Sequence, residues 1–419
     1  MAADIKTYPL PVATSDIPTA WMSSSEPRVA SGGSKRYVQI ASQNGTVTSG
    51  GQLVFPLPSG AGSGFLTSGS AYLKFTVSVT QPSAYSWAFR NIGCASSCIF
   101  RMTAVLSGAV AEQIQHYSKL YASIISHATS YQHVASDSAV TENTLNGLIS
   151  TQTINVCVPV GLGVFNARHH LPLFLLSAGQ LQVDLENVVN AITGISNAVS
   201  EYSVSSAQLI FEQLCPDTAY EMAVKQMLGS KVYSMPINSW YNNRYANTGA
   251  INQIIGLNTS SLRAVMWNIV PQDGVAAAAG HFTDGGQTQC QLSLDGTLVH
   301  NGSLLGADTA QQFLEMKRCL CLMFDAERSS VGPVADNGAT AAANDFRLAF
   351  LTRANYATGA YLGGLSTHRT NESGFSFVGS PCQQATLAWQ GTAGGNMYIY
   401  CARQSVLLIA GDTSVNIVH

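Results

Sequence analysis

The residues from Leu171 to Val189 constrain the fold of this chain more than any other stretch. They begin with a short apolar run, Leu-Pro-Leu-Phe-Leu-Leu, and both Pro172 and Gly179 would interrupt a helix there. Beyond Gly179 the residues alternate, with Leu181, Val183 and Leu185 on one side and Gln182, Asp184 and Glu186 on the other. This period of two predicts a half-buried strand. An apolar run, a loop and then an alternating strand indicate where one sheet of a β-sandwich hands over to the next.

The composition favours two all-β domains with extensive subunit contacts. The chain has 419 residues, which is more than one core usually holds, so two domains of roughly 180 to 200 residues are expected. Its 37 glycines indicate many turns. Only 10% of the residues are charged, against a usual fraction of about 25%. So few charges predict that neighbouring subunits cover much of the surface.

The charge pattern argues against nucleic-acid packaging by this chain. The net charge is −3 and no block of the sequence is strongly basic, so direct or sequence-specific binding of nucleic acid is not expected. No run of 18 apolar residues occurs, and the first residues lack the order of a signal peptide. We therefore expect synthesis in a reducing cell interior, without secretion. Nine cysteines are then best interpreted as buried thiols. The four sequons, at Asn44, Asn258, Asn301 and Asn371, are interpreted as chance.

The sequence divides into an arm, two sandwiches and a linker. Residues 1–36 are rich in proline and serine and nearly neutral, which predicts a disordered arm or a clamp onto a neighbouring subunit. Residues 37–215 and 231–419 show the period of β-strands. Between them, residues 216–230 have helical spacing, with Asp217 to cap the first amides and Gly229 to end the helix. Tyr220, Val224, Met227 and Leu228 would form its apolar stripe.

In the first half, one helix is expected over residues 111–125, where Ile114, Tyr117 and Leu120 have helical spacing. The polar residues 126–150 predict a long loop. The strands predicted there, apart from the stretch already described, are Tyr37–Ala41, Gln52–Pro56, Ala71–Val79, Ile99–Leu106, Val156–Val160 and Tyr202–Leu214.

In the second half, Asp308 is expected to begin a short helix. Residues 359–364 predict a glycine-rich loop. The strands predicted there are Leu262–Val270, Leu292–Leu294, Phe346–Leu351, Ala385–Trp389, Met397–Ile409 and Val415–Val418.

Four of these segments carry a resemblance to a known family: Tyr202–Leu214, the Leu-Pro-Leu-Phe-Leu-Leu run with Gly179, the strand at 260–265 and the strand pair at 403–418. Together they resemble the double jelly-roll major capsid proteins of tailless icosahedral viruses, the adenovirus-like lineage. The resemblance implies an all-β fold of two eight-stranded jelly-roll β-sandwiches side by side, with a few short helices in loops and a linker helix. It also implies a homotrimer that forms a pseudo-hexagonal capsomer. Such capsomers tile an icosahedral virion shell with neighbouring capsomers and penton or minor capsid proteins, often around an internal membrane.

Three residue pairs could suggest catalytic or metal chemistry, and each has a simpler interpretation. His169 and His170, beside Arg168, would point to opposite faces of a strand, so a surface or interface role is expected. The cysteine pairs Cys94/Cys98 and Cys319/Cys321 lack zinc-binding spacing. Asp184 and Glu186 would share one strand face as glycosidase carboxylates do, but a solvent-facing edge is the favoured interpretation. No catalytic residue, cofactor or metal is therefore predicted.

The aromatic residues Trp240, Tyr241 and Tyr245, near Arg244, could stack on a sugar or a base. An aromatic belt at a domain or subunit contact is the favoured interpretation. The leading hypothesis is thus a structural shell protein that is not an enzyme, whose loops at 126–150, 271–289 and 329–345 project outward or lock neighbours. The alternative is a single jelly-roll capsid protein or a β-sandwich carbohydrate-binding or attachment protein.

Overall fold

A computed structural model gives the structure of the chain. It describes residues 34–81, 86–91, 94–128, 139–143, 149–194, 199–229, 231–270, 282–300, 302–320, 331–335, 346–350, 356, 361–367 and 379–419. The predicted arm lies outside these ranges except for residues 34–36, and so does most of the predicted loops at 126–150, 271–289 and 329–345. None of the helices in the described ranges is long and apolar enough to cross a membrane.

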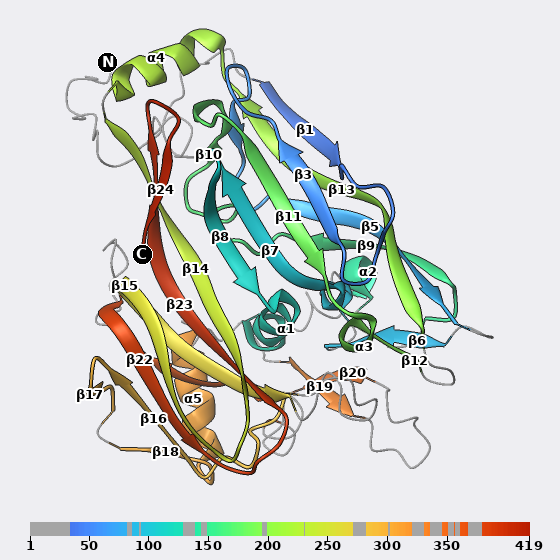
Figure 1. Ribbon diagram of the computed structural model, residues 1–419, viewed down its shortest axis with the longest axis vertical. Helices are drawn as coiled ribbons and strands as arrows, with labels where there is room; N and C mark the ends of the chain where they lie inside the picture. Colours follow the sequence, from blue (N-terminus) through green and yellow to red (C-terminus); the bar gives the residue numbers. More distant parts are fainter. Residues whose placement is uncertain are drawn as a thin grey trace.

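The first half of the chain folds into two large antiparallel sheets (Figure 1). The seven-stranded sheet contains β1 (Ser34–Ala41), β2 (Val47–Thr48), β4 (Phe65–Leu66), β5 (Tyr72–Thr80), β9 (Thr153–Pro159), β10 (Leu171–Pro172) and β13 (Glu201–Cys215). The four-stranded sheet contains β3 (Gln52–Leu57), β7 (Ile99–Leu106), β8 (Ala109–Gln115) and β11 (Gly179–Leu185). A separate pair joins β6 (Trp87–Phe89) and β12 (Ile192–Gly194). Neighbours in both sheets are distant in sequence, since β13 lies between β4 and β5, and β11 between β3 and β7.

The predicted hand-over between sheets is confirmed. Leu171 and Pro172 pair with β4 in the seven-stranded sheet, and Gly179 onward pairs with β3 and β7 in the four-stranded sheet. A single 3-10 turn, Leu173–Leu175, links the two. The side chains of Leu181, Val183 and Leu185 are at most 4% exposed, because alternate residues of the strand face the core.

Two details of this stretch were predicted wrongly. Glu186 does not share a solvent-facing strand face with Asp184, because the register shifts after Asp184 and the strand ends at Leu185. The Glu186 side chain is only 6% exposed. Asp184 does not lie at a sheet edge either, since β11 is flanked by β3 and β7 and the Asp184 carboxylate forms an ion pair with Arg101 on β7.

The helices of the described ranges are short and lie between strands. They are α1 (Tyr117–Ala128), α2 (Ala139–Glu142), α3 (Val188–Ala191), α4 (Thr218–Leu228) and α5 (Thr309–Cys319), with a 3-10 turn at Ala95–Cys98. The helix expected over 111–125 begins later, because β8 occupies residues 109–115 and His116 adopts a positive φ of 48°. Ile114 is therefore a fully buried strand residue. The stretch predicted as one loop, 126–150, contains the short helix α2.

The helix between the halves is confirmed as α4. Asp217 occupies its N-cap position, but its side chain makes no capping hydrogen bond, so that part of the prediction is wrong. Gly229 ends the helix with a φ of +47°, a conformation that glycine adopts at little cost. Tyr220, Val224 and Leu228 pack against the core, whereas Met227 of the expected stripe is 49% exposed.

The second half is built on one nine-stranded antiparallel sheet. Its members are β14 (Val232–Ala246), β15 (Ala250–Val270), β16 (Gln289–Leu294), β17 (Thr297–Leu298), β18 (Leu304–Leu305), β21 (Gly363–Ser366), β22 (Ser380–Gln390), β23 (Asn396–Ala410) and β24 (Val415–Val418). A further pair joins β19 (Val331–Ala335) to β20 (Phe346–Phe350). The residues from 363 onward, expected to end a glycine-rich loop, form β21.

The longest strand, β15, changes partner along its 21 residues. Its first part pairs with β22, and its second part, from Leu262, pairs with β23. Two register shifts between Gly256 and Leu262, together with a φ of 44° at Asn258, mark the change. Only the part from Leu262 was predicted as a strand. Bulges and bends of this kind let one strand serve two parts of a curved sheet.

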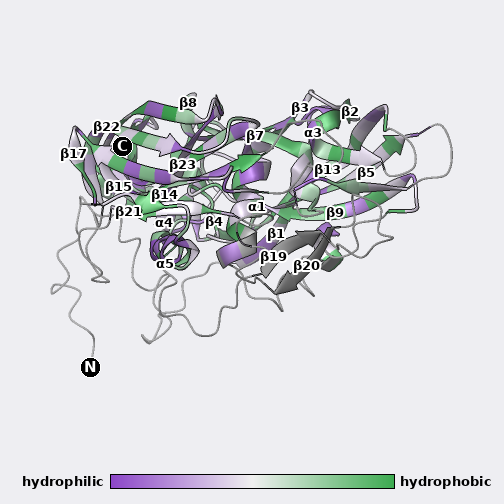
Figure 2. Ribbon diagram, turned by 90° about the horizontal axis from the view of Figure 1, so that it is seen from below, coloured by the Kyte–Doolittle hydropathy of each residue, from purple (hydrophilic) through white to green (hydrophobic). Residues whose placement is uncertain are grey.

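The all-β class is confirmed, and the core follows the strand alternation. Figure 2 shows hydrophobic and hydrophilic bands alternating along the strands of both halves. The two halves lie side by side, and their buried apolar side chains form one cluster. Trp87 in the first half and Trp267 and Trp389 in the second are fully buried. Each of these rings removes a large apolar area from water, which is the main stabilising contribution to such a fold.

Candidate functional site

The most informative surface of the molecule is the contact between the two halves. On one side lie β8, α1 and the turns at residues 161–170, and on the other lie β14, β15, β23 and β24. We call this contact the seam. Figure 1 shows β8 and α1 facing β14 and β23 along it. The seam is the place where the chain determines how its two sheet systems are oriented.

At Gly163 the two halves approach each other backbone to backbone. A Cβ atom placed on Gly163 would lie 1.9 Å from the carbonyl oxygen of Asn238 on β14. Real side chains do not tolerate such a distance, so only glycine fits there without moving one half against the other.

Hydrogen bonds between buried polar groups cross the seam. Asn268 Nδ2 on β15 donates to Ser123 Oγ on α1 at 2.7 Å, and Tyr400 OH on β23 donates to Asn268 Oδ1 at 3.1 Å. Ser123 in turn donates to the carbonyl oxygen of Lys119 at 2.8 Å. Ser123, Asn268 and Tyr400 are all at most 1% exposed. A buried polar group is favourable only when it is hydrogen-bonded, so this chain of bonds fixes the position of α1 against the second half.

A histidine ring and an amide extend the seam beside this chain of bonds. The His116 ring lies edge-on between Phe100, at 5.1 Å, and Tyr398 of β23, at 5.2 Å between ring centres. Asn242 Nδ2 of β14 donates to the carbonyl oxygen of Gln115. Both contacts lie where β8 ends, so the turn into α1 is held by the second half.

The linker helix is fastened to the first half by one buried carboxylate. Glu221 of α4 is 1% exposed, and its two oxygens accept hydrogen bonds from the amides of Gly62, at 2.6 Å, and Gly64, at 2.9 Å. Gly64 has a φ of +56°, and a Cβ there would lie 2.0 Å from the carbonyl oxygen of Leu214. Hydrogen bonds to a charged group are stronger than neutral ones, so Glu221 ties the connection between the halves to the first half.

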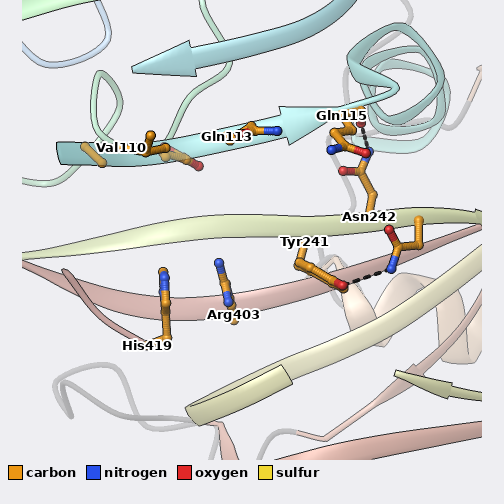
Figure 3. A pocket seen from close by; sticks show the side chains of 10 residues that line it. Val110, Gln113, Gln115, Tyr241, Asn242, Arg403 and His419 are labelled. Atoms are coloured by element: carbon orange, nitrogen blue, oxygen red, sulfur yellow. Dashed lines mark hydrogen bonds between the residues drawn. The ribbon is translucent and has the colours of Figure 1, made fainter. Parts of the chain in front are cut away.

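The seam contains a pocket of about 320 Å³ (Figure 3). Its lining comes from β8, β14, β23 and the residue after β24: Val110, Ala111, Glu112, Gln113, Gln115, Tyr241, Asn242, Asn243, Arg403 and His419. Arg403 Nε donates to Ser239 Oγ at 3.2 Å, and its guanidinium lies 5.8 Å from the centre of the Tyr241 ring. His419 Nδ1 lies 2.9 Å from Ser405 Oγ.

Burial shifts the titration of the pocket's ionisable groups. It raises the pKa of Glu112 to about 8, although the amide of Val164 donates to Oε2 at 3.0 Å. The other carboxyl oxygen, Oε1, is buried without a hydrogen-bond partner. Burial also lowers the pKa of His419 to about 4, and nearby Arg403 adds to this effect. Near neutral pH, Arg403 is thus the charged group of the pocket.

A second polar cluster lies inside the first half. Glu142 of α2 is 1% exposed and accepts hydrogen bonds from Cys94 Sγ and from Tyr121 OH, the latter at 2.8 Å. Burial raises the pKa of Glu142 to about 7. Tyr121 stacks on Tyr117 with 5.6 Å between ring centres. These contacts attach α2 to the core, which gives the cluster a structural role.

Residues considered earlier for metal or catalytic chemistry do not come together. His169 and His170 lie in an irregular segment rather than on a strand, so the strand argument was wrong, and His170 Nδ1 accepts from the amide of Ser68 at 3.1 Å. Among the described residues, no group of three or more His, Cys, Asp or Glu is placed to hold a metal ion.

The described cysteines are free thiols. Six of them are buried, Cys157 and Cys215 are half-buried, and Cys321 lies outside the described residues. The expectation of buried thiols therefore holds for most of them, including Cys94, Cys98 and Cys319.

The predicted aromatic belt lies on β14. Tyr241 lines the seam pocket, in agreement with a domain contact, while Trp240 and Tyr245 are half-buried and pack against the core. Asn243 Nδ2 donates to the hydroxyl groups of Tyr241 and Tyr245, at 2.9 and 3.3 Å. Arg244 is exposed.

The residues that hold the seam together, Gly163, Ser123, Asn268 and Glu221, were not singled out from the sequence. Small polar residues and glycine carry no periodic signal, and their partners lie far away in the chain. Asp217-Thr-Ala-Tyr-Glu221 could have signalled that a buried acid sits in the first turns of the linker helix, but nothing in it identifies Gly62 and Gly64 as its partners.

Comparison with known proteins supports the same fold. No protein-family model matches the chain, and no curated protein matches it in sequence. Three solved structures are similar over almost their whole length. PBCV-1 VP54, fitted into a reconstruction of the virophage Sputnik, is 12% identical with a TM-score of 0.62, covering 94% of this chain and 98% of that one. The Faustovirus major capsid protein is 8% identical with a TM-score of 0.57, covering 92% of each chain. A chain of the Sputnik virophage is 12% identical with a TM-score of 0.57, covering 94% of this chain and 89% of that one. At such low identity these likenesses show the fold, and the chain has the double jelly-roll fold of viral major capsid proteins.

Proposed function

We propose that this chain is a major capsid protein whose subunits trimerise into pseudo-hexagonal capsomers and assemble into an icosahedral virus shell. The observation that carries the proposal is the likeness to PBCV-1 VP54, which spans 94% of this chain and 98% of that one. Both sandwiches and the connection between them fall within that likeness. A binding module built on one sandwich would share only half of it.

The way in which the halves are joined supports a role as a building block. The backbone contact at Gly163, the bonds through Asn268 and the anchor at Glu221 hold the halves at one orientation. A shell needs such rigid units, because contacts between many copies repeat accurately only when each copy has the same shape.

The surface also suits repeated subunit contacts. Charged residues make up 10% of the chain, which leaves little electrostatic repulsion between copies. Large apolar side chains are exposed on several elements: Tyr37, Val110, Val140, Val189, Met222, Met227, Ile254, Leu298, Leu305, Leu314 and Val418. Exposed apolar side chains on one monomer are candidates for burial against others.

In this proposal the division of the chain is an arm at 1–36, jelly rolls at 37–215 and 231–419, and a linker at 216–230. The homotrimer contacts neighbouring capsomers and penton or minor capsid proteins, and encloses an internal membrane where one is present. The protein is a virion component made in the interior of the host cell. Its role is structural rather than enzymatic, and its net charge of −3 fits a shell that makes no direct sequence-specific contact with the genome.

The mass of the purified protein in solution tests the proposal. Light scattering should give three times the chain mass of 44.3 kDa, and images of the same sample should show pseudo-hexagonal particles or closed shells. A monodisperse monomer that persists at micromolar concentration would contradict it. Glycan binding by such a monomer would then favour the attachment protein.

A further inference from the structure

We infer that the seam pocket is a binding site for a small oxyanion, such as phosphate, sulfate or a carboxylate, held by Arg403 and His419 at the contact between the two sandwiches. This inference goes beyond the proposed shell function, since it concerns a ligand within one subunit. It requires no partner chain and makes no use of the trimer.

Arg403 has donors that no described group accepts. Its guanidinium makes one hydrogen bond, from Nε to Ser239 Oγ, and one contact with the face of Tyr241. No carboxylate in the described ranges forms an ion pair with it. Nη1 and Nη2 are therefore left without an acceptor among the described residues. Burial lowers the pKa of Arg403, which is the expected cost of placing a cation where water is partly excluded. An anion between the halves would offset that cost.

The rest of the pocket does not compete with an anion. Glu112 is the acidic side chain in the lining, and with its pKa raised to about 8 it is mostly neutral at pH 7. The Coulomb attraction between Glu112 and Arg403 is accompanied by no ion pair within 4 Å. The lining therefore carries one positive charge near neutral pH, where a direct Glu–Arg pair would have cancelled it.

His419 supplies a second donor beside Arg403. Its Nδ1 is engaged with Ser405 Oγ, and Nε2 has no protein partner. With Ser405 donating to Nδ1, the neutral ring carries its proton on Nε2 and can donate to a ligand. Figure 3 shows the Arg403 and His419 side chains pointing the same way, toward β8, where Gln113 and Gln115 lie on the opposite wall. Amide groups there can bind the remaining ligand oxygens directly or through water.

The size of the pocket fits a small ligand with a few waters. Its volume of about 320 Å³ is roughly ten times the ~30 Å³ that one water occupies in the liquid. Because the walls come from both sandwiches, a bound oxyanion contacts both. It would stabilise the joined arrangement in proportion to its occupancy.

The test is ligand-dependent thermal unfolding of the full-length protein at pH 7. Sodium phosphate, sulfate and acetate are titrated at constant ionic strength against sodium chloride, and calorimetric titration with phosphate measures affinity directly. We expect the unfolding midpoint to rise and saturate with at least one oxyanion and not with chloride. We expect Arg403→Gln to weaken that affinity at least tenfold, and His419→Gln to weaken it less.

The control is Arg168→Gln, which removes an exposed arginine of the first half outside the pocket and should leave the affinity unchanged. The proposal is overturned if no oxyanion stabilises the protein more than chloride does, or if Arg403→Gln responds like the wild type. If Arg403→Gln does not fold, the wild-type structure with selenate decides instead. Anion density within hydrogen-bond distance of the Arg403 Nη atoms supports the site, and a pocket without anion density at saturating selenate overturns it.

Discussion

Asn268 Nδ2 donates a hydrogen bond of 2.7 Å to Ser123 Oγ across the seam, joining residues 145 positions apart in the chain. Asn268 Oδ1 accepts from Tyr400 OH on the neighbouring strand. A single buried amide therefore connects a helix of the first sandwich with two strands of the second. The orientation of the sandwiches depends on such bonds as well as on apolar packing.

Replacing Asn268 with alanine should lower the free energy of unfolding by about 2 to 4 kcal/mol, since the Ser123 and Tyr400 hydroxyls lose a partner and a cavity forms. Urea unfolding measures this. In a double-mutant cycle with Ser123→Ala, the two losses should be non-additive by at least ~0.5 kcal/mol. Asn155→Ala, at an exposed site on the outer sheet surface, is the control and should cost no more than about 0.5 kcal/mol. Additive losses would mean that the bond does not couple the halves.

Gly163→Ala should destabilise the protein by about 2 kcal/mol or more, because the new methyl group would meet the Asn238 carbonyl at 1.9 Å. The matched control is Gly256→Ala, since a Cβ there meets nothing within 4 Å. Thermal unfolding compares the two variants, and imaging shows whether Gly163→Ala particles keep their outline. Equal stability of the two variants would disprove the backbone contact.

Glu221→Gln should lower the free energy of unfolding by about 1 to 3 kcal/mol, because the two amide hydrogen bonds of the carboxylate lose their charge and one loses its acceptor. Limited proteolysis should also cut the linker at 216–230 faster in this variant. Glu201→Gln, at an exposed position of β13, is the control and should behave like the wild type. Unchanged proteolysis of Glu221→Gln would show that other contacts hold α4.

Stability should fall with rising pH through ionisation of Glu142. Its pKa is raised in the folded state from an ordinary value of 4.5 to about 7, so the folded state binds the proton more tightly than the unfolded state does. This contribution is complete below pH 4.5 and is lost as the pH rises to about 7, and it amounts to about 3 kcal/mol. Glu142→Gln, which cannot ionise, should show a smaller drop in unfolding temperature between pH 5 and 8. An identical pH profile would assign the effect to other groups.

Removing the residues before Ser34 should leave the stability within about 0.5 kcal/mol of the full chain but reduce shell formation. This cut keeps β1, whose Lys35 pairs with Glu212 and whose Arg36 donates to Gln213. A longer deletion through Ala41 removes the strand and should lower the unfolding temperature. Shells that form unchanged from the shorter deletion would rule out a clamp.

The sequence was most informative where side chains alternate along a strand. Leu181, Val183 and Leu185 were placed correctly because burial of every second residue is a local property of a strand. Glu186 was misplaced because a register shift after Asp184 ends the alternation. Ile114 was assigned to a helix because apolar residues on a short strand before a helix can match either period.

The seam could not be predicted for a different reason. Ser123, Asn268 and Gly163 are buried only because another part of the chain covers them, and neither their type nor their spacing announces that. Glu142 shows the same limit, since a helix of four residues is too short for a periodic signal and its acid is buried only through Cys94 and Tyr121.

The close approach at Gly163 has a consequence for curvature. A hinge between the jelly rolls would need room to close, and there the two backbones already touch. In a closed shell built from this chain, each subunit would therefore act as a stiff tile. The bending that distinguishes a flat facet from a vertex would have to be taken up at the joints between tiles.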